Sequence, residues 1–204
     1  MLMNLKHHHK PWEYIEIENF LPSLEFQKIQ HLAKIELERY RIEGTNTRRG
    51  QYVRWIDEDI LPQANELFDI LPRRKSTGAL KKLLHWAITP AFSRYPTHID
   101  NKSRLSTVTF YVSPDNNVGT ILCENSSTND NGDHNAPDHP SKNEYEIKWQ
   151  PNKVFLHCGG SKKWHRMRSG ENDRVILSCF LVQPDLIGKG KPDLDHLIDL
   201  YEKS

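Results

Sequence analysis

The fold of this chain is indicated most clearly by residues 104–112, which read R-L-S-T-V-T-F-Y-V. The run is rich in β-branched and aromatic residues, which favour strands. Turn residues follow directly at positions 113–116, S-P-D-N, and end the run. We therefore predict a strand whose apolar members are Leu105, Val108, Phe110 and Val112.

Similar short segments alternate with turn residues from about residue 80 onward. We predict further strands at residues 92–96, 119–123, 153–158 and 174–182. The preceding part of the chain is more helical. After a predicted strand at residues 14–20, Pro22 and Ser23 supply a turn and an N-cap. The apolar positions at helical spacing that follow are Phe26, Ile29, Leu32, Ala33 and Leu37.

A second helix is predicted over residues 59–71, with Leu67 and Phe68 buried and Pro72 at its end. Helices first and strands later are typical of a β-sandwich or barrel with a helical layer on one face. Residues 124–142 contain one apolar residue and are predicted to form a long polar surface loop. The apolar residues of a predicted closing helix are Leu194, Leu197, Ile198 and Tyr201.

Composition excludes several classes of protein. No run of eighteen apolar residues occurs, so no membrane-spanning helix is expected, and the first residues show no signal peptide. The net charge of +1 gives no reason to expect nucleic-acid binding. The three cysteines include no C-x-x-C pair, which favours free thiols in a reducing compartment and a cytoplasmic location.

A candidate metal site begins at His98-Ile99-Asp100. Side chains two apart in an extended chain point to the same side, so this imidazole and carboxylate converge. His165, which precedes the apolar strand at 174–182, is the best candidate for a third ligand. Two histidines and one carboxylate on one face of an octahedron suit non-haem iron(II) and leave three positions open. The H-x-D pattern alone is weak, because the chain has eleven histidines.

Arg174, nine residues after His165, sharpens this hypothesis. A buried guanidinium is the natural partner of the far carboxylate of a cosubstrate that chelates iron through its 2-oxo acid end. The alternative is an arginine at a strand end that faces solvent, and the spacing alone does not separate the two.

Residues 95–182 resemble the double-stranded β-helix core of the 2-oxoglutarate- and iron(II)-dependent oxygenases, and most of all its prolyl hydroxylase branch. The resemblance rests on five elements in the family's order. They are His98-Ile99-Asp100, the strand at 104–112 of the type R-x-x-T-x-x-x-Y-L, the glycine-led strand at Gly119, the segment from Pro151 through Phe155 to His165, and Arg174. The family usually has two glycines where this chain has Val118-Gly119, which leaves the substrate in doubt more than the chemistry.

The resemblance implies a jelly-roll core with N-terminal helices packed on the larger sheet, within a single domain of residues 1–204. Residues 1–80 would support the core at residues 81–184, and residues 190–202 would form the closing helix. It implies that His98, Asp100 and His165 bind iron(II). It implies cofactors and cosubstrates too: iron(II), 2-oxoglutarate and dioxygen, with ascorbate as a candidate reductant.

The resemblance also implies roles for other side chains. Tyr111 would donate to the distal carboxylate of 2-oxoglutarate beside Arg174, with core packing as its alternative. Arg104 and Phe180 fall at positions of the substrate mouth, although Phe180 replaces a residue that is often Trp. Tyr95 either lines the pocket or fills the core.

The implied activity is hydroxylation of an unactivated C–H bond, of proline within a peptide or protein, with release of succinate and carbon dioxide. Two alternatives stay open: the same chemistry on a free amino acid or nucleobase, and a non-catalytic jelly-roll binding module. The oligomeric state is unknown.

Three other clusters are given simpler interpretations. His7-His8-His9 is interpreted as a solvated run near the N-terminus, and the acidic and histidine residues between 130 and 139 as part of the polar loop. The basic residues that flank His165 form either a rim for an anionic substrate or a solvated hairpin end; they are Lys162, Lys163, Arg166 and Arg168.

Overall fold

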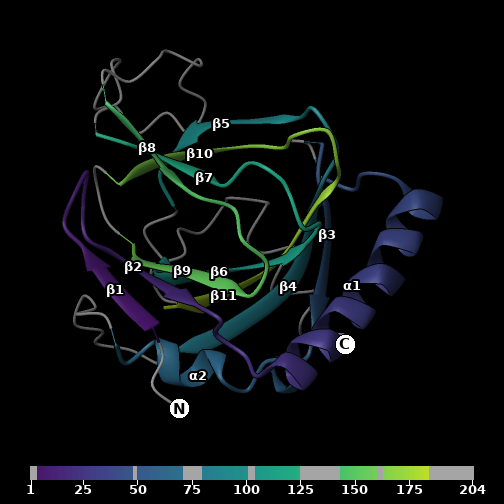
Figure 1. Ribbon diagram of the computed structural model, residues 1–204, viewed down its shortest axis with the longest axis horizontal. Helices are drawn as coiled ribbons and strands as arrows, with labels where there is room; N and C mark the ends of the chain where they lie inside the picture. Colours follow the sequence, from purple (N-terminus) through teal and green to yellow (C-terminus); the bar gives the residue numbers. More distant parts are fainter. Residues whose placement is uncertain are drawn as a thin grey trace.

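The computed structural model describes residues 4–47, 50–70, 80–100, 104–124, 143–159 and 163–183. They form two antiparallel sheets that face each other, with a long helix, α1 (Ser23–Glu43), alongside the larger sheet (Figure 1). The larger sheet has the order β1-β2-β9-β6-β11-β4-β3. Its strands are β1 (Asn4–His8), β2 (Tyr14–Glu18), β3 (Tyr52–Ile56), β4 (Lys81–Thr89), β6 (Arg104–Ser113), β9 (Lys153–Cys158) and β11 (Arg174–Val182).

The smaller sheet has the order β5-β10-β7-β8. Its strands are β5 (Arg94–His98), β7 (Thr120–Cys123), β8 (Glu144–Ile147) and β10 (Trp164–Arg168). This is the jelly-roll architecture that the resemblance implies, with the N-terminal helix packed on the larger sheet.

The predicted strands agree closely with the observed ones. Residues 153–158 and 174–182 coincide with β9 and β11. β5 begins at Arg94 and not at residue 92, because Phe92 lies in a turn with a φ of 56° and an exposed side chain. A positive φ is uncommon for a residue other than glycine and does not occur in a regular strand.

Helix α1 covers the outer face of the larger sheet against β4 and β6. Ile29 and Ala33, two of the apolar positions predicted from the helical spacing, are buried in this contact. Glu36 on the same face is also buried, and its carboxylate accepts two hydrogen bonds from Arg54 on β3, at 2.7 and 2.6 Å. A bidentate pair of this kind satisfies both charges, so α1 is joined to the edge strand of the sheet.

The predicted second helix over residues 59–71 is wrong in extent. The structure has a 3-10 helix at Glu58–Ile60 and a short helix α2 at Ala64–Leu67 instead. Pro62 lies between them, and a proline inside a helix lacks the N–H donor and clashes with the preceding turn. Leu67 and Phe68 are buried as predicted.

The N-terminal hairpin of β1 and β2 extends the larger sheet through the pairing of β2 with β9. The sequence predicts β2 but not β1, because β1 reads N-L-K-H-H and none of its side chains is buried. Lys153 on β9 is buried and pairs with Glu16 on β2 at 3.0 Å. With β3, the region expected to support the core supplies three strands of the larger sheet.

Alternation along β11 separates the two faces of the larger sheet. Val175 and Leu177 belong to the apolar core beneath α1, whereas Ile176 belongs to a second core between the sheets. Arg174 reaches the same side as Ile176, where it contacts Thr120 of the smaller sheet. Strand β11 therefore directs Arg174 into the space between the two sheets.

Two predictions lie outside the described residues: the closing helix at 190–202 and nearly all of the polar loop at 124–142. Within the described part, no helix has the length and apolar character needed to span a lipid bilayer.

Candidate metal centre

The pairing of β5 with β10 brings two predicted metal ligands together. His98 on β5 and His165 on β10 are direct partners in the antiparallel register, and their ring centroids lie 4.3 Å apart. Asp100 follows β5, two residues after His98, as the i, i+2 spacing predicts. One candidate ligand atom from each of the three residues lies within 4.8 Å of the other two.

The carboxylate of Asp100 is held from two sides. Oδ2 accepts a hydrogen bond from Oγ1 of Thr107 at 2.6 Å, and Oδ1 accepts one from Arg104 at 3.0 Å. Burial alone would raise the pKa of Asp100, but Arg104 and the three histidines around it hold the pKa well below its ordinary value. The group is therefore an anion fixed in orientation, which is what a metal ligand requires.

His165 is oriented by the backbone. Its Nδ1 lies 3.1 Å from the carbonyl oxygen of Lys163. A carbonyl can only accept, so Nδ1 carries the proton and Nε2 keeps its lone pair for a metal. A backbone carbonyl behind the ring is a common way to fix both the tautomer and the orientation of a metal-ligating histidine.

A further histidine lies in the same cluster and was not predicted. His157 on β9 is almost fully buried, with Nε2 3.6 Å from Oδ2 of Asp100 and its ring 5.2 Å from that of His165. Burial lowers the pKa of His157 to about 4. The sequence signal was a lone histidine in the apolar strand K-V-F-L-H-C, two residues after the inward-facing Phe155.

Arg174 has no exposed surface and no carboxylate partner among the described residues. Its Nη1 lies 2.9 Å from Sδ of Met167, its Nη2 donates to Oγ1 of Thr120 at 3.3 Å, and its Nε has no partner in that part of the chain. Burial lowers the pKa of Arg174, but a guanidinium still stays charged near neutral pH. A buried cation with an unused donor is chemically suited to bind an anion.

Tyr111 lies beside this guanidinium, with the Arg174 Cζ atom 5.4 Å from its ring. Its hydroxyl donates to Oγ1 of Thr120 at 2.9 Å and accepts from the backbone N–H of Thr120 at 3.0 Å. Trp149, which was not predicted, stacks on the Tyr111 ring at 4.6 Å and lies 5.2 Å from the guanidinium carbon. The cationic group thus lies among two aromatic rings, the hydroxyl of Thr120 and the thioether of Met167.

Of the residues predicted to line the substrate mouth, Arg104 and Tyr95 contact candidate metal ligands, and Phe180 contacts Arg104. Arg104, which binds Asp100, also places its guanidinium 3.8 Å from the centroid of the Phe180 ring. Tyr95 packs edge-on against His98 at 4.7 Å. The structure therefore brings all three close to the candidate metal centre.

Comparison with solved structures supports the fold. No family model matches the chain, and no curated protein matches its sequence. A prolyl hydroxylase from Trichoplax adhaerens, solved with a peptide fragment of the hypoxia inducible factor, matches with a TM-score of 0.64 and 16% identity over 87% of each chain. A prolyl-4-hydroxylase from Pseudomonas putida matches with a TM-score of 0.59 and 14% identity, over 83% of this chain and 92% of that chain. The epimerase SnoN, in complex with Fe3+, alpha ketoglutarate and nogalamycin RO, matches with a TM-score of 0.57 and 12% identity, over 83% of this chain and 78% of that chain.

The chain has the double-stranded β-helix fold of these enzymes. Its own residues fit the iron and the 2-oxo acid that the SnoN complex contains. Two imidazoles and a carboxylate are a donor set for non-haem iron(II) with three positions left open. Arg174, which has no carboxylate partner and an unused Nε within the described part of the chain, suits the distal carboxylate of 2-oxoglutarate.

The basic residues around His165 that the structure describes do not share one environment. Arg166 is buried and makes a bidentate pair with Glu144 on β8, at 2.6 and 2.7 Å. Trp164 is buried in a small apolar cluster with Ile121 and Cys123. Lys163 turns its ammonium group toward the ring of Trp12, 5.8 Å from the ring centroid.

Two aromatic side chains near Phe180, those of His85 and Trp55, were also not predicted from the sequence. His85 on β4 lies between Trp55 and Phe180, with ring centroids at 4.8 and 5.0 Å. It is buried, and its Nδ1 has no partner among the described residues. Burial lowers the pKa of His85 to about 3, and the charge of Arg104 adds to this shift.

Because His85 is buried in its neutral form, we expect the stability of the fold to depend on pH. The unfolded chain protonates His85 below about pH 6.5 but the folded chain only near pH 3, so the unfolded state binds more protons between these values. The free energy of unfolding should therefore fall as the pH is lowered through this window. We expect His85→Phe to reduce that fall, measured by urea unfolding of the metal-free protein between about pH 7 and pH 4. Equal slopes in both proteins would contradict this assignment.

Proposed function

We propose that the chain is an iron(II)- and 2-oxoglutarate-dependent dioxygenase that hydroxylates proline within a peptide. The observation that carries the proposal is a fully buried Arg174 with no carboxylate partner among the described residues, in a fold that also gathers two histidines and an aspartate. A charge in such a position costs stability unless an anion joins it. A ligand with one carboxylate for Arg174 and a 2-oxo acid end for the metal fits both features.

The residues of the chain divide the work between binding and orientation. His98, Asp100 and His165 would hold iron(II), with Thr107 and Arg104 fixing the carboxylate. Arg174 and Tyr111 would hold the distal carboxylate of 2-oxoglutarate, and Trp149 would keep water from that pair. With iron(II) bound there, the chemistry supplied would be oxidative decarboxylation of 2-oxoglutarate by dioxygen, giving succinate and carbon dioxide, coupled to insertion of the second oxygen atom into a C–H bond.

The choice of a peptidyl substrate rests on two supports. The Trichoplax adhaerens neighbour was solved with a peptide fragment. In this chain Arg104 and Tyr95 contact residues of the triad and Phe180 packs on Arg104; all three are the residues for which the resemblance implies a substrate mouth. The SnoN complex favours a second candidate, a small metabolite, because its ligand is nogalamycin RO.

The test is mass spectrometry of proline-rich peptides incubated with the protein, iron(II), 2-oxoglutarate and ascorbate. We expect a mass gain of one oxygen on proline, absent from the matched reaction with His165→Ala. Free proline should be a poor substrate. A strong succinate signal with free amino acids or nucleosides, and none with any peptide, would move the assignment to the metabolite. The absence of both metal binding and 2-oxoglutarate turnover would leave a binding module without catalysis.

A further inference from the structure

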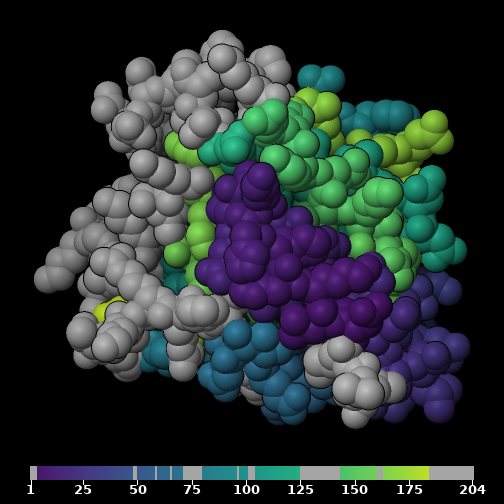
Figure 2. Space-filling model, turned by 60° about the vertical axis from the view of Figure 1, so that its left-hand side comes forward, coloured from purple at the N-terminus to yellow at the C-terminus, as the bar shows by residue number. Residues whose placement is uncertain are grey.

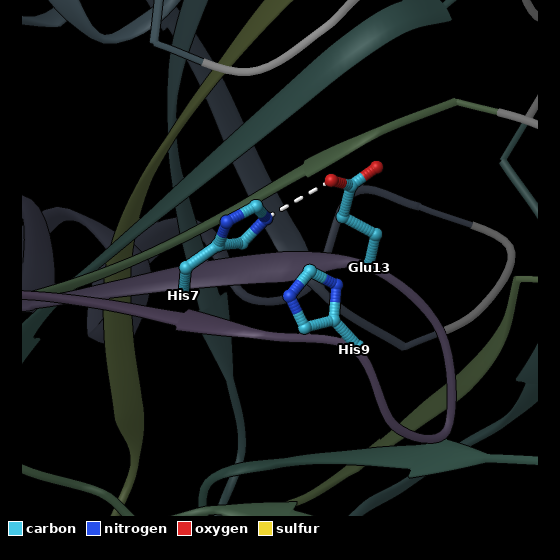
Figure 3. A group of neighbouring side chains, drawn as sticks. All are labelled: His7, His9 and Glu13. Carbon is cyan, nitrogen blue, oxygen red and sulfur yellow. Dashed lines mark hydrogen bonds and ion pairs between the residues drawn. The ribbon is translucent and has the colours of Figure 1, made fainter.

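A second group of metal-ligating side chains lies on the N-terminal hairpin, apart from the candidate centre between the sheets. His7 on β1, His9 directly after it and Glu13 directly before β2 each offer a ligand atom within 4.8 Å of the other two. Nε2 of His7 is 3.0 Å from Oε1 of Glu13, and the rings of His7 and His9 are 4.6 Å apart. Figure 3 shows the three side chains turned toward one another from the hairpin strands and the segment that joins them.

The register of the hairpin explains why these residues meet. His8 pairs with Tyr14, so His7 and His9 point to the opposite face of β1 from His8. The ring of His8 stacks on Tyr14 at 4.5 Å, and its Nε2 lies 3.2 Å from the Glu16 carboxylate. Both contacts of His8 are therefore on the other face of the hairpin. The sequence interpretation of three equivalent solvated histidines is therefore incomplete, because the fold separates the middle one and adds Glu13 to the outer two.

The site is open to solvent and needs no rearrangement of the core. His7 and His9 are exposed and Glu13 is partly exposed. In the space-filling view the N-terminal residues, coloured purple, form a broad area of the surface (Figure 2). The backbone beneath them is fixed by the ladder of five residue pairs between β1 and β2.

We propose that His7, His9 and Glu13 bind a zinc-class divalent cation. Two imidazole nitrogens and one carboxylate oxygen are a common ligand set for Zn²⁺, with water in the fourth, tetrahedral position. Imidazoles favour zinc, copper or nickel over magnesium or calcium, which prefer oxygen ligands. The hydrogen bond between His7 and Glu13 already brings two of the ligands close together. The inference does not depend on the proposed dioxygenase activity.

The ion would also hold the segment that reaches the candidate active site. Glu13 points outward, whereas its neighbour Trp12 is buried between the sheets, 5.3 Å from the ring of His157 and 6.5 Å from that of His165. An ion bound to His9 and Glu13 connects the two ends of the segment 9–13 that carries Trp12. Zinc on the outer face thus fixes an indole that lies beside His165, one of the candidate iron ligands, on the inner face.

The test is calorimetric titration of Zn²⁺ into the double variant His98→Ala/Asp100→Ala, which removes two ligands of the other centre. We expect one zinc ion per chain in this background. Adding His7→Ala or Glu13→Gln should weaken that binding by at least about 10- to 100-fold, the range for losing even an outer partner of a metal ligand. Adding His8→Ala, the matched control on the opposite strand face, should leave it unchanged.

Zinc binding that is absent from the folded double variant, or unaffected by both His7→Ala and Glu13→Gln, would overturn the proposal. Circular dichroism establishes that each variant is folded. Amide hydrogen exchange tests the effect on Trp12 independently of activity. Zinc should slow exchange in residues 9–13 of the double variant and should not do so when His9→Ala is added. Exchange unchanged by bound zinc would refute the fixing of this segment.

Discussion

Asp100→Asn protein is expected to bind no iron(II) at the candidate centre and to form no succinate from 2-oxoglutarate, although it should fold. The asparagine keeps the shape of the side chain, and its carbonyl oxygen still accepts the hydrogen bond from Arg104. What it removes is the negative charge, the only one in the ligand set of His98, Asp100 and His165. The same loss is expected for His98→Ala, because each ligand supplies one of three protein contacts to the metal.

Iron binding measured anaerobically and succinate formation measured separately distinguish loss of metal from loss of later steps. His31→Ala is a suitable control because this histidine is exposed on α1, on the far side of the larger sheet from the centre. It should bind iron and form succinate as the unaltered protein does. Normal turnover by Asp100→Asn or His98→Ala would show that the substituted residue is not a metal ligand.

The candidate metal ligands could be predicted from the sequence because two of them are close in the chain and the third precedes a strand with a clear apolar pattern. His98 and Asp100 share a side of an extended segment at any position in the fold. The strand at 174–182, after His165, is apolar apart from Arg174 and Ser178, which makes it a clear strand signal. Their meeting depends on the β5–β10 register, which the sequence pattern alone does not specify.

Other features were not accessible because long-range pairing decides them. Every residue of β11 is buried, so alternation between apolar and polar positions does not say which face Arg174 takes. Trp12 lies just before β2, and His157 lies on β9. The two side chains meet at the centre only because these strands are neighbours. The error at residues 59–71 has a local cause. Apolar spacing predicts one helix there, but Pro62 lacks the N–H donor that a continuous helix needs at that position.

Arg174→Lys is expected to weaken the binding of 2-oxoglutarate by about 1–3 kcal/mol, the range for a hydrogen bond to a charged group. Lysine keeps the positive charge but loses the planar fork that matches a carboxylate with two parallel bonds. Affinity is measured by titration with manganese(II) replacing iron, so that no turnover occurs. Arg166→Lys is the matched control, since Arg166 is equally buried but already paired with Glu144. An unchanged dissociation constant in Arg174→Lys would exclude Arg174 as the carboxylate partner.

Arg174→Met separates a binding role from a structural one. In the ligand-free protein the guanidinium is a buried charge with no carboxylate beside it among the described residues, and replacing such a charge by an apolar side chain of similar length is often neutral or stabilising. We therefore expect Arg174→Met to unfold at the same or a higher denaturant concentration than the unaltered protein. Added 2-oxoglutarate should stabilise the unaltered protein, because a ligand that binds only the folded state shifts the equilibrium toward it, and should not stabilise the variant. If Arg174→Met were strongly destabilised and 2-oxoglutarate still stabilised it, the arginine would be a structural residue and the anion site would lie elsewhere.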